Sequence, residues 1–123
     1  MPEGRPSAQA FMDALRPSDS LHNTHLVLAE CTTVIRREVF FRRIRHEQAL
    51  DLMNRLLNVP LQFSSDPQTY GRALDLARRF QHKKAYDMQY LALAETVGAE
   101  LVTMDRGLRH AATQVGVPVR FLT

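Results

Sequence analysis

Apolar side chains recur every three or four residues along three stretches in the first half of the chain. This spacing is typical of helices that bury one face. It predicts helices over residues 8–15, 25–41 and 49–57, with a brief extended segment from Leu21 leading into the second helix. The third helix should end before Pro60, because proline cannot continue a helix.

The second half of the chain begins with a helix start signal, aspartate followed by proline at 66–67, for a helix that should end near Gln81. Residues 85–97 are apolar on nearly every side, so this helix is expected at the centre of the fold, with a glycine cap after it. A shorter helix is expected over 108–115. For the helix that starts at the aspartate–proline pair, the buried face is predicted to consist of Tyr70, Ala73, Leu74, Ala77 and Phe80.

Short apolar segments between the helices are predicted to be strands, at 61–64, 101–103 and 117–122. Helices that alternate with short strands favour an α/β fold, a short parallel sheet covered by helices. At 123 residues the chain is long enough for one hydrophobic core and too short for two ordinary domains. We therefore expect a single domain over 1–123, with residues 1–7 irregular.

Composition narrows the class of protein. The chain is 45% hydrophobic and 24% charged, as in globular proteins that fold. No apolar run approaches the roughly 18–20 residues that span a bilayer, and no apolar segment follows the amino terminus as in a secretory signal. From the lack of such a run we expect no membrane span. The single Cys31 has no partner for an intrachain disulfide, which agrees with a reducing compartment, so we expect a cytoplasmic protein. The scattered glycines form no phosphate-binding loop, which disfavours nucleotide-binding classes.

Charge gives a weaker indication of the partner. A net charge of +3 and an isoelectric point of about 9.5 favour acidic partners such as nucleic acid. Basic side chains gather at 36–45 and 78–84, with Arg106 and Arg109 near the carboxyl end. Each group taken alone is explained more simply as the solvated end of a helix.

Three carboxylates stand at unusual positions along the predicted elements. Glu30 lies near the start of a helix, Asp87 in the first turn of the most apolar helix, and Asp105 just after a buried strand. Taken singly, Glu30 and Asp87 could complement helix dipoles, and Asp105 could cap the helix that follows. In an open parallel sheet, however, the carboxyl ends of the strands and the amino ends of the following helices share one edge. The three side chains are therefore expected to point into one crevice.

Three neighbouring carboxylates require compensation. Two unit charges about 4 Å apart at an effective dielectric near 20 repel by roughly 4 kcal/mol, so such a group needs a cation or a raised pKa. Oxygen ligands without thiolate or imidazole neighbours favour Mg²⁺ or Mn²⁺ over zinc, and the histidines lack zinc-site spacing with Cys31. The sequence therefore predicts a divalent-metal site.

The segments around these carboxylates carry a family resemblance. Residues 26–31 (LVLAEC), 85–94 (AYDMQYLALA) and 101–108 (LVTMDRGL) resemble the successive acidic motifs of the PIN-domain ribonucleases, with the VapC-type toxins of bacterial toxin–antitoxin pairs as the nearest relatives. Order and spacing agree over about 8–122. The resemblance implies a three-layer α/β/α fold and a metal-dependent endoribonuclease whose three carboxylates hold Mg²⁺ or Mn²⁺. It also implies an RNA substrate, a cognate antitoxin protein and a homodimer.

Further roles follow from the resemblance. The metal would lower the pKa of a bound water and neutralise charge on the phosphate. Thr103 resembles the family's small hydroxyl before the last acid and is assigned a supporting catalytic role. Lys83 and Lys84, just ahead of Asp87, are candidates for phosphate contact or for no role at all.

The sequence also departs from the family. PIN domains begin with a central strand that ends in their first aspartate, whereas residues 1–7 contain two prolines and a glycine. The first central strand and its acid are therefore expected to be missing through truncation or a misassigned start, through decay to a binding protein, or with another acid as replacement. The alternative function is a degenerate PIN-like module without nuclease activity that binds a protein or RNA. A weaker alternative is an RNA-binding α/β protein whose carboxylates only cap helices.

Overall fold

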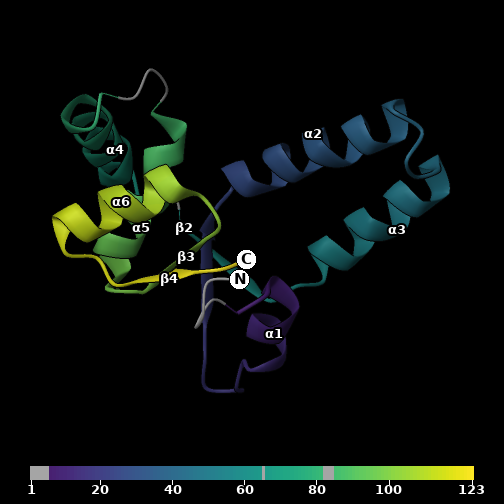
Figure 1. Ribbon diagram of the computed structural model, residues 1–123, viewed down its shortest axis with the longest axis horizontal. Coiled ribbons are helices and arrows are strands. Elements are labelled where there is room, and N and C mark those ends of the chain that lie inside the picture. Colours follow the sequence, from purple (N-terminus) through teal and green to yellow (C-terminus); the bar gives the residue numbers. More distant parts are fainter. Residues whose placement is uncertain (1–5, 65, 82–84) are drawn as a thin grey trace. The chain divides into compact units, whose positions relative to one another are not determined.

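The computed structural model describes residues 6–64, 66–81 and 85–123, which form helices alternating with short strands (Figure 1). The described elements are α1 (Ala8–Asp13), β1 (Leu21–Thr24), α2 (Leu26–Phe40), α3 (His46–Leu57), β2 (Leu61–Ser64), α4 (Gln68–Arg79), α5 (Tyr86–Val97), β3 (Leu101–Thr103), α6 (Arg106–Val115) and β4 (Val119–Phe121). None of the helices described is both long enough and apolar enough to cross a membrane.

The chain divides into two compact units. The core unit comprises residues 1–20 and 65–123, and the hairpin unit comprises residues 21–64. Each holds one pair of parallel strands, β3 with β4 in the core unit and β1 with β2 in the hairpin unit. The predicted α/β fold with parallel strands and covering helices is confirmed, and its described strands pair two by two. The expected loss of a first central strand stays a prediction.

The hairpin unit is a parallel strand pair joined by two helices. The register runs from Leu21 opposite Leu61 to Thr24 opposite Ser64. The connecting helices α2 and α3 contact each other, and the Thr32 hydroxyl lies 3.8 Å from the Met53 sulfur. Neither helix buries much: α2 has no buried residue, and α3 has one, an alanine. The hairpin unit is therefore stabilised more by the backbone hydrogen bonds between β1 and β2 than by a hydrophobic core of its own.

The end of α2 is a tight turn with an arginine in an unusual conformation. The Arg43 N–H donates to the Glu38 carbonyl at 2.9 Å, and the Arg42 N–H donates to the Val39 carbonyl at 3.0 Å, the bonding pattern of a Schellman cap. This cap needs a left-handed residue, and Arg42 supplies it with φ of 58°. A side chain in that region costs about 1–2 kcal/mol, which is why glycine is preferred there.

The core unit is built around α5. Met88, Leu91 and Ala92 are 0% exposed, and they belong to a cluster that includes Leu76 of α4 and Ala112 of α6. The helix ends at Gly98, whose φ of 67° places it in the left-handed region, as the glycine after an apolar helix suggested. The prediction that this helix is central is confirmed, because Met88 and the four residues 91–94 are all buried.

The predicted buried face of α4 is partly wrong. Ala73 and Ala77 are buried as expected, but Tyr70 is 59% exposed and Leu74 is 65% exposed. Leu76, which the prediction left out, is 0% exposed. A stripe through positions 69, 73, 76 and 77 and one through 70, 74 and 77 are both compatible with helical spacing. The small alanines let α4 approach α5 closely, and this contact selects the first stripe.

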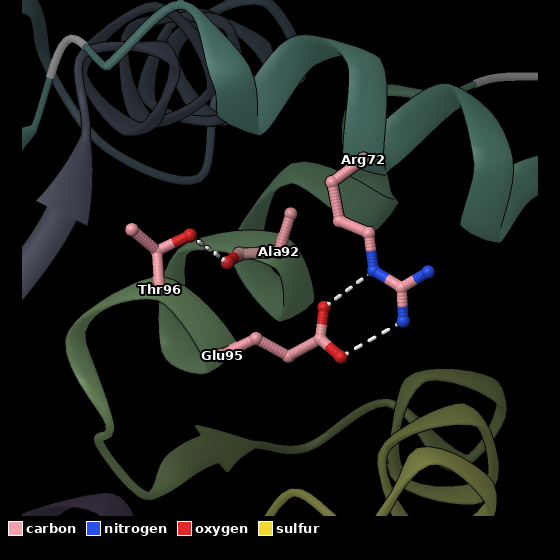
Figure 2. A network of polar contacts seen from close by, with 4 residues as sticks. All are labelled: Arg72, Ala92, Glu95 and Thr96. Carbon is pink, nitrogen blue, oxygen red and sulfur yellow. Dashed lines mark hydrogen bonds and ion pairs between the residues drawn. The ribbon is translucent and has the colours of Figure 1, made fainter.

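A charged pair joins α4 to α5 at the rim of this core (Figure 2). The Arg72 guanidinium donates two hydrogen bonds to the Glu95 carboxylate, Nε to Oε1 at 2.7 Å and Nη2 to Oε2 at 2.9 Å. This hydrogen bonding raises the pKa of Arg72 above its ordinary value. At the next residue of α5, the Thr96 hydroxyl donates to the Ala92 carbonyl at 2.8 Å. The forked geometry adds a directional contact between α4 and α5 at the edge of their apolar interface.

Candidate metal centre

Asp105 lies between β3 and α6, and hydrogen bonds hold both its side chain and its backbone. Its Oδ1 accepts a hydrogen bond from the Leu108 N–H at 2.8 Å, which makes Asp105 the N-cap of α6. Its own N–H donates to the Thr103 hydroxyl oxygen at 3.0 Å. The capping role considered for Asp105 is therefore confirmed. The cap uses only one of the two carboxylate oxygens.

The second oxygen of Asp105 is available for a ligand. The residue is exposed, and within the described ranges no hydrogen bond to Oδ2 is seen. The cap holds the carboxylate plane in place, so that Oδ2 is presented without rotational freedom of its own. A carboxylate fixed through one oxygen and open at the other is a favourable ligand for a hard cation.

Gly107 gives this carboxylate its room, and the sequence reasoning missed it. A Cβ built at Gly107 would lie 3.3 Å from Asp105 Oδ1, tighter than most such contacts. The available signal was the glycine two residues after the acid, inside a helix where glycine is otherwise unfavourable.

Thr103, at the end of β3, acts on the backbone of Asp105. Its hydroxyl accepts the hydrogen bond from the Asp105 N–H, and its side chain is half-buried. The contact gives the hydroxyl a definite structural task, which is to orient the residue that carries the carboxylate. Its supporting role in catalysis stays a prediction.

Asp87 lies in the first turn of α5, as predicted, and is half-buried next to the fully buried Met88. The N-cap residue, Ala85, offers no side-chain acceptor to this helix end. A negative charge here is favoured by the partial positive charge of the helix amino terminus. Lys83 and Lys84, the candidates for phosphate contact, lie outside the described residues.

Glu30 lies on α2, in the hairpin unit, and is half-buried. It stands beyond the first turn of the helix, where the dipole effect has faded, so the simple electrostatic explanation does not account for it. Burial, and then the charge of Glu30, raise the pKa of the adjacent Cys31 thiol. Cys31 is therefore protonated at neutral pH, and the donors that the segment offers are oxygens.

The structure brings some of the predicted residues together. Thr103 and Asp105 are bonded to each other, and Asp87 belongs to the same core unit, whereas Glu30 belongs to the hairpin unit. Across residues 6–64, 66–81 and 85–123, no three His, Cys, Asp or Glu side chains gather closely enough to hold a metal ion. The three-carboxylate site thus stays a prediction that rests on the sequence motifs.

Comparison with known proteins identifies the family. No match was found among curated proteins. The PIN domain, a family of modules that are generally metal-dependent nucleases, matches residues 1–114. That range contains the helices α1 to α5, the strands β1 to β3 and every candidate carboxylate. The chain therefore belongs to the PIN-domain family.

Proposed function

We propose that this protein is a metal-dependent endoribonuclease of the VapC type, a cytoplasmic toxin that cleaves RNA and is neutralised by a cognate antitoxin. The observation that carries the proposal is the family match over residues 1–114, which includes all three acidic motifs. A homodimer is part of the same proposal. The confirmed cap at Asp105 supports it further, because the cap leaves one carboxylate oxygen available.

In this proposal Glu30, Asp87 and Asp105 hold Mg²⁺ or Mn²⁺. Their donors are carboxylate oxygens, and the neighbouring Cys31 is kept as a thiol, so the donor set fits a hard cation. When bound, the metal supplies an activated water and neutralises the charge that develops on the phosphate.

The residues of the chain position the reaction. Asp105 presents Oδ2 because the Leu108 N–H holds Oδ1, and Thr103 fixes the Asp105 backbone. The role proposed for basic side chains near the site is to bind the RNA backbone through its phosphates.

The test is a cleavage assay on labelled RNA with the purified chain. Cleavage is expected with Mn²⁺ or Mg²⁺, is expected to stop on adding EDTA, and should return when Mn²⁺ is restored in excess. Calorimetry should show Mn²⁺ uptake by the wild-type chain. Cleavage that continues unchanged in EDTA would contradict a metal-dependent mechanism.

Gly107 offers a second prediction, on the geometry of the site. In Gly107→Ala the added methyl group must displace the Asp105 carboxylate by a few tenths of an ångström. Since misplacement by 1 Å can cost about a hundredfold in rate, we expect cleavage to fall about tenfold. Stability should change little, because the helix preference for alanine over glycine opposes the weakening of the contact between the Asp105 carboxylate and the Leu108 N–H. Cleavage equal to wild type, with the variant folded, would show that the carboxylate position is not critical.

A second candidate function is a PIN module that binds a partner protein or RNA without cleaving it. It is favoured by the core unit, which holds Asp87 and Asp105 and in which no three metal-binding side chains gather among the described residues. Calorimetric titration separates the two functions, because such a module should take up no Mn²⁺ tightly while still binding its partner.

A further inference from the structure

The turn between α2 and α3 carries a concentration of exposed arginine and phenylalanine. We call residues 36–45 the hairpin tip. Phe40 is 66% exposed and Phe41 is 56% exposed, far more than is usual for phenylalanine. Five exposed arginines accompany them in ten residues: Arg36, Arg37, Arg42, Arg43 and Arg45.

The two rings and two of the arginines form an ordered group. The Phe40 and Phe41 ring centroids lie 5.2 Å apart with planes at 86°, so the two rings face in different directions. The Arg36 guanidinium carbon lies 6.0 Å from the centre of the Phe40 ring, and that of Arg43 lies 5.3 Å from the centre of the Phe41 ring. Each ring thus has a guanidinium over one of its faces, and both residues remain largely exposed to solvent.

The tip is strongly positive. Its one acidic residue, Glu38, forms an ion pair with Arg43 at 3.0 Å. Arg37 and Arg42 form no ion pair with any residue that the structure describes, and both are exposed. Four arginine charges are therefore left for an anionic partner, around two exposed aromatic side chains.

The backbone at the tip is also costly. The left-handed position is filled by glycine after α5 and α6, by Gln81 after α4, and by Arg42 at the tip. Strained backbone of this kind concentrates at functional positions. At Arg42 the strain keeps a charged side chain on the turn that also carries Phe40 and Phe41.

We propose that the hairpin tip binds single-stranded RNA, with bases stacked on Phe40 and Phe41 and phosphates bound by the arginines. Exposed aromatic rings can stack with unpaired bases, and every base has a face for stacking, whereas a duplex keeps its bases inside. Surplus positive charge beside those faces fits the phosphate backbone. The choice of RNA rests on the proposed function, and the binding itself does not require cleavage.

Fluorescence anisotropy with a short labelled oligouridine in EDTA tests the proposal, because no cleavage takes place without metal. The double variant Phe40→Ala/Phe41→Ala should bind at least about tenfold more weakly, since stacking contributes strongly for each base. Both side chains are exposed, so the fold should be kept, and circular dichroism checks this. Phe40→Tyr/Phe41→Tyr should retain affinity, because tyrosine stacks as well.

Tyr70→Ala is the matched control, because Tyr70 is a similarly exposed aromatic residue in the core unit, and no arginine lies over its ring among the residues that the structure describes. It should bind RNA as the wild type does. The oligouridine annealed to oligoadenine should bind more weakly than the single strand.

Arg42→Gly separates binding from folding. Glycine relieves the left-handed strain, so the melting temperature should rise or stay unchanged, while RNA affinity falls. The slope of log affinity against log salt concentration should become shallower by about one. A folding artefact would move stability and affinity in the same direction.

Three results would overturn the proposal. The first is equal affinity of the double alanine variant and the wild type, and the second is equal binding of the duplex and the single strand. The third is a wild-type dimer that dissociates in the double alanine variant while RNA affinity is unchanged. The last result would assign the tip to contact between copies of the chain. Failure of the proposed function is distinguishable, because RNA that is bound through the tip and never cleaved in Mn²⁺ leaves this inference intact. Conversely, if the double alanine variant cleaves RNA with an unchanged KM, the tip does not bind the substrate, and the proposed nuclease function stands without it.

Discussion

Asp105→Asn is expected to abolish RNA cleavage while leaving the melting temperature unchanged. Asparagine caps a helix about as well as aspartate, so its amide oxygen can accept the Leu108 N–H that Asp105 Oδ1 accepts now. The amide lacks the negative charge that holds a divalent cation. Metal catalysis contributes several kcal/mol of transition-state stabilisation, so cleavage should fall by about 10³-fold or more. Cleavage kinetics and thermal unfolding measured on one preparation check both parts.

Matched variants identify the cause. Asp87→Asn should lose activity to a similar degree, and Asp75→Asn, at an exposed position on α4, should cleave as the wild type does. Asp105→Ser should also keep the cap and lose the activity. Asp105→Ala should lose both, with a cost of about 1 kcal/mol for the missing cap. Retained cleavage by Asp87→Asn or Asp105→Asn would end the assignment of these carboxylates to a metal.

Leu91→Ala is expected to lower the free energy of unfolding by about 2–5 kcal/mol, the cost of removing a fully buried leucine side chain. Leu91 is 0% exposed and lies in the cluster that α4, α5 and α6 share. A small domain has only about 5–15 kcal/mol of stability in total, so this is a large fraction. The melting temperature should fall by about 10–20 °C. Urea unfolding followed by circular dichroism measures the effect.

Leu74→Ala is the control for this change. Leu74 carries the same side chain but is 65% exposed on α4, so its truncation should alter stability by no more than about 0.5 kcal/mol. Equal losses in the two variants would show that burial in the cluster around α5 does not account for the stability of the core unit.

Local patterns carried most of the secondary structure. The α5 helix was predictable because a run of apolar residues that ends in glycine has few other solutions, and α6 ends in the same way, at Gly116. Strand β2 was predictable from its alternation and its turn residues. These signals lie within a few residues of the element that they specify.

Features that depend on distant contacts were harder to predict. Two stripes fit the spacing on α4, and only the approach of α5 decides between Leu74 and Leu76. The pairing of strands two by two depends on hydrogen bonds between segments far apart in the chain. The arginines at 36–45 were expected to be solvated helix ends, and no local pattern indicated that Phe40 and Phe41 stay open beside them.

For the candidate site, the sequence predicted positions better than contacts. Asp105 lies where the pattern put it, after a strand and before a helix, because its side chain starts that helix. The division of its two oxygens between a cap and an open side depends on atomic geometry. The crowding at Gly107 likewise becomes visible only when the carboxylate and the helix backbone are both in place.

The parallel pair in the hairpin unit bears on the order in which the chain assembles. Strands β1 and β2 are separated along the chain by all of α2 and α3, and closing so long a loop costs entropy that pairing must recover. Contact between α2 and α3 shortens that loop, so the tight turn at Arg42, which lets the two helices meet, is expected to lower the entropy cost of pairing the strands. Residues 21–64 interrupt the core unit in sequence. The two parts of the core unit contact each other where the Thr123 N–H donates to the Pro6 carbonyl at 2.9 Å. Contacts of such long range slow folding, so completion of the core unit is expected to follow closure of the hairpin.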